Sequence, residues 1–206
     1  RLEAFVRLFK VQKRLEWILN ERALAFGNGV HPKHALTKYH QFFVDNIIDG
    51  ENVLDIGCGY GAVAFSVASN RPLSRVVGLD INTKSLAKAR ALFNLTNLSF
   101  HYADATEVVP DGEWNIIILS NVLEHIADRV TFLKNLTTTA RVSRLLIRVP
   151  LFERDWTVAL RKELGIPYFS DEDHKIEHTL NEFHSELKDA NLEVITVSTI
   201  WGEIWA

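Results

Sequence analysis

A glycine-rich turn and the acidic residue beside it are the part of this sequence best suited to chemistry on a bound ligand. The segment Asn52–Gly61 opens as a short apolar strand that contains Asp55, and glycine then occupies every second position. Glycine tolerates positive φ and has no Cβ, so such a turn lets the backbone approach a ligand closely. A helix expected from Ala62 aims its free N–H groups at the same turn. Because burying an unpaired carboxylate is costly, we expect Asp55 to have polar partners there.

Strands and helices alternate along the middle of the chain, and they must position this turn. Alternation with short connections is typical of a parallel, doubly wound sheet with helices on both faces. The apolar run Ile116–Leu119 fits a strand that is covered on both sides. We therefore predict an α/β fold with a Rossmann-like, mostly parallel, seven-stranded sheet. The central strands are expected over residues 52–57, 75–80, 98–103, 114–120 and 144–150, with helices over 60–69, 83–95 and 127–140.

The flanking segments complete the predicted organisation. Residues 1–20 have the periodicity of a basic amphipathic helix, and a second helix is expected over 35–48. Such a basic helix can bind a membrane surface or a partner, but we favour packing over the domain. We thus predict a helical extension or lid over 1–48 and a single domain over 49–206. After residue 150 we expect helices over 155–164 and 180–189, and a strand over 192–200 that turns back through 201–205.

The composition restricts the class of protein. With 206 residues, 47% hydrophobic and 24% charged, the chain is an ordinary globular domain. Its formal net charge of -3 makes a nucleic-acid partner unlikely, because such proteins usually carry a basic footprint. The single cysteine, Cys58, excludes internal disulfides and fits a reducing compartment. No apolar run approaches the roughly 20 residues of a membrane span, so we expect a cytoplasmic protein; the composition leaves the oligomeric state open.

Further polar residues stand where the predicted strands end. Asp80 ends the second strand, Asp104 follows the third, and Ser120 and Asn121 end the fourth. In a doubly wound sheet the carboxyl ends of the strands border the crevice in which ligands bind. We therefore expect these side chains and the glycine turn to face one ligand site.

Two cofactor classes suit a glycine turn after the first strand. Residues 57–62 satisfy the loose Gly-x-Gly-x-x-Ala form of the dinucleotide fingerprint, and Asp80 follows at about the expected spacing of roughly 20 residues. Dinucleotide turns normally follow an apolar strand, whereas this strand carries Asp55. An acid at this rim would repel a pyrophosphate, and Asp104 adds a further acid. These features favour a cofactor with positive charge and hydroxyl donors.

Four motifs in order resemble those of the class I S-adenosylmethionine-dependent methyltransferases. The resemblance covers roughly residues 50–150 and implies S-adenosyl-L-methionine as the cofactor. The flanks, including His31–His34 and Trp201–Trp205, resemble a group of small bacterial methyltransferases. The four motifs are Leu54–Gly61, Val77–Asp80, Ala103–Ala105 and Leu119–Ile126.

The resemblance implies a role for each motif. The glycine turn lies under the methionine and ribose of the cofactor, and Asp80 accepts hydrogen bonds from both ribose hydroxyls. Asp104 accepts one from the adenine amino group, beside the backbone of Ala105. Asp55 orients the turn and meets the amino end of the cofactor. The predicted cofactor-binding residues are Asp55, Gly57, Cys58, Gly59, Gly61, Asp80, Ile81, Asp104, Ala105, Ser120 and Asn121, the last two on the sulfonium side.

The acceptor side of the site is predicted from residues around the same crevice. His125 and Glu124 follow the fourth strand and are the first candidates for the catalytic base, although this turn often only braces the next helix in the family. With His174 or His178 the two also offer N and O ligands for a metal. Some RNA-end methyltransferases hold magnesium with a Glu-x-x-Glu-His arrangement. Here Asn121 replaces the first glutamate of that arrangement, so we predict no metal. Further substrate-side candidates are His31, His34, Tyr39, Asp155 and Trp156.

The predicted function is methyl transfer from S-adenosylmethionine to a small-molecule acceptor, such as the hydroxyl of a sugar or another metabolite. A sulfonium already activates the methyl group, so the enzyme must align the acceptor and exclude water. The alternatives are an RNA or protein methyltransferase, a non-catalytic S-adenosylmethionine-binding regulator, and an NAD-dependent oxidoreductase. Stabilisation by S-adenosylhomocysteine rather than by NAD separates the first three from the last.

Overall fold

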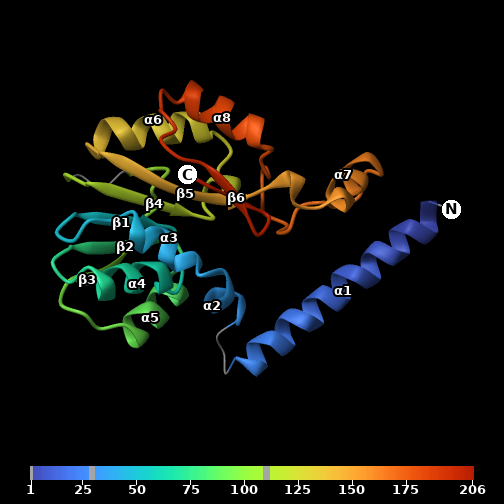
Figure 1. Cartoon of the computed structure of the whole chain (residues 1–206), viewed down its shortest axis with the longest axis horizontal. Coiled ribbons are helices and arrows are strands. Elements are labelled where there is room, and N and C mark those ends of the chain that lie inside the picture. The colour runs from blue at the N-terminus through green and yellow to red at the C-terminus, as the bar shows by residue number, and fades with distance from the viewer. Residues whose placement is uncertain (1, 28–30, 109–111) are drawn as a thin grey trace.

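A seven-stranded sheet forms the centre of the computed structural model, which describes residues 2–27, 31–108 and 112–206 (Figure 1). The strands lie in the order β3-β2-β1-β4-β5-β7-β6. The first five in this order pair in parallel, and β7 runs antiparallel to both of its neighbours. The doubly wound, mostly parallel sheet is therefore confirmed. The strands are β1 (Val53–Ile56), β2 (Val76–Asp80), β3 (Leu98–Tyr102), β4 (Ile116–Ser120), β5 (Arg144–Pro150), β6 (Ser198–Ile200) and β7 (Glu203–Trp205).

Helices cover both faces of this sheet, because alternate residues of its apolar strands point to opposite sides. Leu54 and Ile117 belong to the core on one face, under α6 (Arg129–Thr139) and α8 (Leu180–Asp189). Val53 belongs to the core on the other face. That face is covered by α3 (Tyr39–Asp45), α4 (Ala62–Asn70) and α5 (Thr83–Leu92) (Figure 1).

The strand register brings the predicted site to one edge. Ile56, the last residue of β1, lies opposite Leu79 on one side and Leu119 on the other. The residues that follow these positions are Gly57, Asp80 and Ser120. The glycine turn and the polar ends of β2 and β4 consequently share the carboxyl edge of the sheet, as we predicted.

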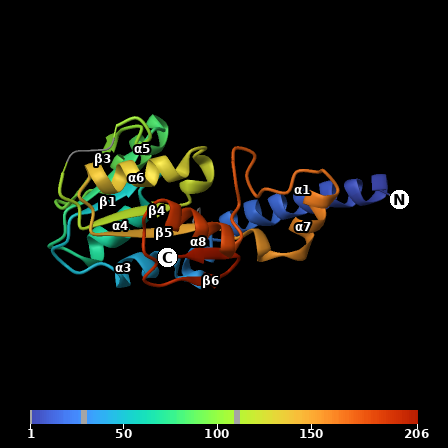
Figure 2. The same ribbon diagram turned by 90° about the horizontal axis from the view of Figure 1, so that it is seen from above.

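The N-terminal helix α1 (Leu2–Phe26) is longer than predicted and stands away from the sheet (Figures 1 and 2). None of its residues is buried, so α1 contributes nothing to the core of the domain. Its recorded contacts reach the segment after β5: Lys13 Nζ lies 3.4 Å from Glu172 Oε1, and the Arg161 guanidinium lies 4.8 Å from the Phe9 ring centroid. Within the described residues, no helix has both the length and the apolar character needed to cross a bilayer.

The helix predicted over residues 35–48 is divided in two. α2 spans Lys33–Thr37, and α3 begins at Tyr39 after Lys38, whose φ of 50° is left-handed. Lysine carries no strong preference for that conformation, so the sequence offers no signal for the break. α3 buries Phe43 and Val44 against the sheet and thus packs with the domain. Residues 28–30, which precede α2, lie outside the described part of the chain.

The chain after β5 matches the prediction except at one strand. η1 (Leu123–His125) follows β4, while η2 (Phe152–Arg154) and α7 (Trp156–Glu163) follow β5. β6 and β7 pair as an antiparallel hairpin, which confirms the predicted turn back through 201–205. The strand predicted over 192–200 is wrong for 192–197, because only Ser198–Ile200 of this segment pairs with β7 and residues 192–197 pair with no strand in the described structure.

Candidate functional site

The glycine turn between β1 and α4 has left-handed backbone at all three alternate glycines. The Cys58 amide donates to Leu79 O at 2.9 Å and ties the turn to β2. A Cβ on Gly61 would lie 2.5 Å from Phe100 Cζ, so the fold requires glycine there. A Cβ on Gly59 would meet no described atom within 4 Å. Gly59 therefore faces open space, which is where a ligand can approach the backbone.

Asp80 at the end of β2 connects the turn to the next helix. Its Oδ2 accepts a hydrogen bond from the Gly59 amide at 2.7 Å, and its Oδ1 accepts one from the Asn82 amide at 2.7 Å. A carboxylate has about four lone-pair sites, so both oxygens retain capacity for further donors. The side chain is held in place and can bind a pair of hydroxyls.

Asp55 in β1 is almost fully buried, with 1% of its surface exposed. Its Oδ2 has no hydrogen-bond partner among the described residues. Burial raises the pKa of Asp55 to about 7; the Ala64 amide opposes this rise and the nearby Asp80 carboxylate adds to it. A buried carboxylate oxygen without a donor is costly, so the site suits a ligand that brings a donor or a positive charge.

The other predicted cofactor residues have distinct surroundings. Asp104 Oδ1 accepts from the hydroxyl and amide of Thr106, at 2.6 and 2.9 Å, and these bonds hold its pKa below the usual value. Ile81 is 62% exposed and offers an apolar surface beside Asp80, while Ala105 is buried. Burial raises the pKa of the Cys58 thiol, which argues against a reactive thiolate.

The end of β4 turns into the segment predicted to face the acceptor. Asn121 has a φ of 57° and donates from Nδ2 to Glu124 Oε1 at 2.8 Å. Glu124 is fully buried, and burial raises its pKa. His125 is partly exposed; its Nδ1 lies 3.1 Å from Asp173 Oδ2, and its ring centroid lies 4.8 Å from that of His174. The structure thus brings Glu124 and His125 together with residues from beyond α7.

The N-terminal candidates lie at two places. Tyr39 is close enough to Asp55 for charge to matter: burial raises the pKa of Tyr39 to about 12, and Asp55 adds to this against the opposing Arg148. The His34 ring centroid lies 4.9 Å from that of Tyr39, with the two ring planes tilted by 49°. His31 instead joins the helices, accepting from the Lys33 amide at 3.1 Å and lying 3.2 Å from the Asn20 side chain. Of the three N-terminal candidates, Tyr39 and His34 are therefore the two that we place beside the predicted site.

Asp155 and Trp156 do not join this group in the structure. Asp155 Oδ1 accepts from the Thr157 amide at 2.7 Å and caps α7. Trp156 is 74% exposed on the same helix. In both views α7 lies beside α1, away from the strands (Figures 1 and 2). Their assignment to the substrate side stays a prediction.

Arg148, Glu203 and Glu177 are functional candidates that we did not predict. Arg148 lies in β5, pairs with Glu203 and stacks 4.5 Å from the Tyr39 ring. An arginine inside the apolar run 145–149 was the available signal, of the same kind as Asp55 in β1. Glu177, which contacts His174, is buried in an irregular segment, where the sequence has no periodicity to indicate it.

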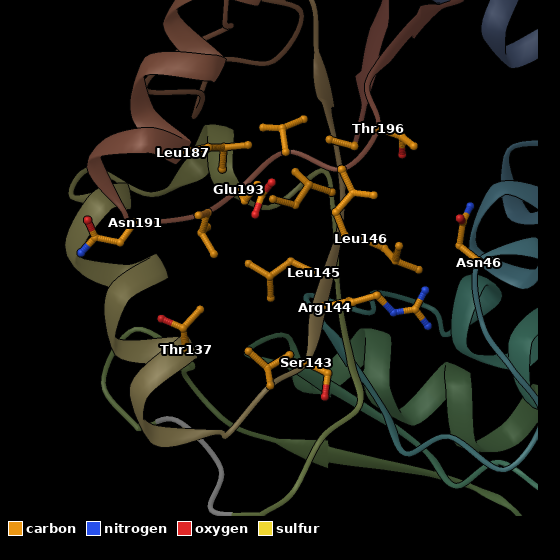
Figure 3. Close-up of a pocket in the computed structure, with 16 residues that line it drawn as sticks. Asn46, Thr137, Ser143, Arg144, Leu145, Leu146, Leu187, Asn191, Glu193 and Thr196 are labelled. Atoms are coloured by element: carbon orange, nitrogen blue, oxygen red, sulfur yellow. The ribbon is translucent and has the colours of Figure 1, made fainter.

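A cavity of about 360 Å³ lies at the opposite edge of the sheet (Figure 3). Its lining includes Arg144 and Leu145 from the start of β5, the segment 192–196, and Ala206. Arg144 pairs with Ile116, the first residue of β4, so this cavity borders the amino ends of the strands. Its lining includes none of the acids or glycines of the carboxyl edge, and we therefore place the chemistry at the carboxyl edge.

Fold and site together define a class I S-adenosylmethionine-dependent methyltransferase. Comparison with known proteins agrees. The family described as methyltransferase domain matches residues 47–194, well over half of the chain, and the chain belongs to this family. Its cofactor is accordingly S-adenosylmethionine.

Curated relatives differ in their acceptors. The ribosomal protein L11 methyltransferase of Burkholderia lata is 35% identical over 111 residues, which are 50% of this chain and 34% of the relative. The ubiquinone biosynthesis O-methyltransferase of Bradyrhizobium diazoefficiens is 30% identical, covering 60% of this chain and 48% of that protein. The (S)-tetrahydroprotoberberine N-methyltransferase of Eschscholzia californica is 32% identical, covering 48% and 30%. The chain thus spans less than half the length of these relatives, and they do not determine its acceptor.

Solved structures share the fold at low identity. A chain from the complex of the Haloferax volcanii Trm112 methyltransferase activator with a methyltransferase superposes with a TM-score of 0.66 at 19% identity, covering 87% of this chain and 77% of that one. Magnesium protoporphyrin IX methyltransferase from Synechocystis, solved with S-adenosylhomocysteine, gives 0.62 at 18% identity, covering 84% and 82%. These likenesses support the fold alone.

Proposed function

We propose that this chain transfers the methyl group of S-adenosylmethionine to a small-molecule acceptor, such as the hydroxyl of a sugar or another metabolite. The observation that carries the cofactor site is the open face of Gly59 beside the fixed carboxylate of Asp80. When bound, the cofactor supplies a methyl group that its sulfonium has already activated.

The chain's own residues fit this cofactor. Asp80 accepts hydrogen bonds from two ribose hydroxyls with the lone pairs that Gly59 and Asn82 leave free. Asp55 provides an oxygen without a partner for the amino group, and an ammonium beside it favours the ionised carboxylate. Asp104 keeps Oδ2 for the adenine amino group, since both bonds from Thr106 go to Oδ1. Ser120 and Asn121 flank the sulfonium side.

The charges near the acceptor side support a small acceptor over RNA. Asp173 lies against His125, and Asp171 and Glu172 beside it are exposed. The phosphates of RNA bind through lysine and arginine contacts, and three adjacent carboxylates would repel them. The chain then needs only to align an acceptor with the methyl group and exclude water, which alone can supply roughly 7–11 kcal/mol.

The acceptor class is tested by labelled methyl transfer. Purified protein and S-adenosylmethionine carrying a labelled methyl group are added to a cell extract that is then fractionated into small molecules, RNA and protein. We expect label in the small-molecule fraction, and none there with the Asp80→Ala variant. Label that appears only in RNA or protein would overturn the small-molecule proposal while leaving the methyltransferase assignment intact.

Gly59→Ala separates close backbone approach from ordinary stability. Both Gly59 and Gly165 have positive φ, and a Cβ on either meets no described atom within 4 Å. Each alanine should therefore destabilise the free protein by a similar amount, about 1–2 kcal/mol. We expect only Gly59→Ala to weaken S-adenosylhomocysteine binding, by more than about tenfold, measured by calorimetry. Equal affinities in the two variants would show that no ligand approaches Gly59.

A further inference from the structure

Glu124, His125 and His174 converge beside the end of β4. One ligand atom from each side chain lies within 4.8 Å of the other two. Glu124 and His125 come from η1, whereas His174 comes from the segment between α7 and α8. Residues about 50 positions apart in the chain thus form one compact group of nitrogen and oxygen donors.

Both imidazoles in this group are oriented by a carboxylate. His125 Nδ1 lies 3.1 Å from Asp173 Oδ2, and His174 Nδ1 lies 3.1 Å from Glu177 Oε1. Glu177 is itself fixed by Arg154 and by the amide and hydroxyl of Ser170. A histidine that binds a metal typically donates its other ring N–H to a carboxylate in this way. With Nδ1 donating to the carboxylate, Nε2 is the nitrogen of each ring that can bind a metal.

The third member supplies an oxygen that lacks a partner. Glu124 is 0% exposed, and its Oε1 accepts from Asn121 at 2.8 Å. Its Oε2 has no partner among the described residues. Leaving a buried carboxylate oxygen unsatisfied costs on the order of 1–3 kcal/mol or more. A cation bound between Glu124 and the two imidazoles would satisfy it.

We propose that Glu124, His125 and His174 bind one divalent transition-metal ion, and that Zn²⁺ fits this donor set best. Two imidazoles and one carboxylate with a fourth position open is a ligand set found in zinc enzymes. This proposal replaces our sequence-based expectation of no metal. It makes His125 a metal ligand in place of a base, and it leaves the open position for an oxygen of the acceptor.

Metal binding by the complete chain tests the proposal without any acceptor. After treatment with a chelator, the protein is titrated with Zn²⁺ by calorimetry and with Co²⁺ by visible absorption. We expect one Zn²⁺ per chain and the absorption of a four-coordinate Co²⁺ site. Glu124→Gln and His125→Gln should each lower the affinity for Zn²⁺ by more than about 100-fold. This loss exceeds the effect of changing a residue that only orients a ligand. His101→Gln, at an exposed histidine in β3, should bind as the wild type does.

Asp173→Asn distinguishes a metal site from surface histidines. Asp173 is exposed, its Oδ2 lies 3.1 Å from His125 Nδ1, and its carboxylate also comes within 4.8 Å of a ring nitrogen of His174, so its loss should weaken Zn²⁺ binding by about 10–100-fold with little effect on thermal unfolding. Glu124→Gln keeps the shape of the buried side chain and an oxygen for Asn121, and circular dichroism checks that this variant folds. Wild-type protein that binds no Zn²⁺, or Glu124→Gln and Asp173→Asn variants that bind it unchanged, would overturn the proposal.

Discussion

Asp80→Ala is expected to abolish measurable stabilisation by S-adenosylhomocysteine. If Asp80 accepts both ribose hydroxyls, the variant loses two hydrogen bonds to a charged group, each worth roughly 1.5–3 kcal/mol. The dissociation constant should then rise by more than about 100-fold. Calorimetric titration of wild type and variant measures the change directly.

A matched control removes a carboxylate elsewhere. Asp189 is exposed at the end of α8, and Asp189→Ala should bind S-adenosylhomocysteine with wild-type affinity. Asp80 also anchors the Gly59 and Asn82 amides, so the variant is expected to lose some stability without ligand. If Asp80→Ala folds and retains wild-type affinity, Asp80 does not hold the ribose.

Asp55→Asn should make the free protein more stable at pH 8 while it weakens cofactor binding. The pKa of Asp55 is raised from 3.8 to about 7 by burial, so the folded state holds the proton more strongly than the unfolded state. Asp55 therefore lowers the free energy of unfolding as pH rises from about 4 to about 7, and the penalty persists above that range. At pH 8 the substitution should raise the free energy of unfolding by on the order of 4 kcal/mol, because each unit of pKa shift corresponds to about 1.4 kcal/mol.

The same substitution acts on the cofactor in the opposite direction. Ionised Asp55 attracts the amino group of S-adenosylhomocysteine, so wild-type affinity should increase between pH 6 and pH 8 as Asp55 loses its proton. The affinity of Asp55→Asn should be lower and should change less over that range. Denaturant unfolding and calorimetry, each at pH 4, 6 and 8, measure both effects. Equal stability of the two proteins at pH 8 would contradict a raised pKa for Asp55.

The sheet could be predicted because periodicity and turn chemistry agree along its centre. Ile116–Leu119 is apolar at every position, which fits β4 between two layers of helices. The secondary-structure predictions fail where the local sequence pattern does not determine the structure. The pattern of Leu192–Val197 predicts a strand, yet only the residues after it, Ser198–Ile200, pair with β7. The break at Lys38 depends on how α3 packs against α4 and has no local signal.

The cofactor side of the site was predictable because its residues stand next to strand ends. Asp55 and Asp80 are recognisable as acids that border a glycine turn, and the register brings them to one edge. The acceptor side depends on contacts between distant segments. His174 and Glu177 come from an irregular segment that only the tertiary structure brings to His125. The order of the motifs and the family resemblance that they carry therefore predicted the cofactor, but not the full environment of Glu124.

Thermal unfolding with S-adenosylhomocysteine and with NAD is the most direct test of the central claim that this chain is an S-adenosylmethionine-dependent methyltransferase. At 100 times its dissociation constant, S-adenosylhomocysteine should stabilise the wild-type protein by about 2.7 kcal/mol, and NAD at the same concentration should not. Stabilisation by NAD, with none from S-adenosylhomocysteine, would contradict the account.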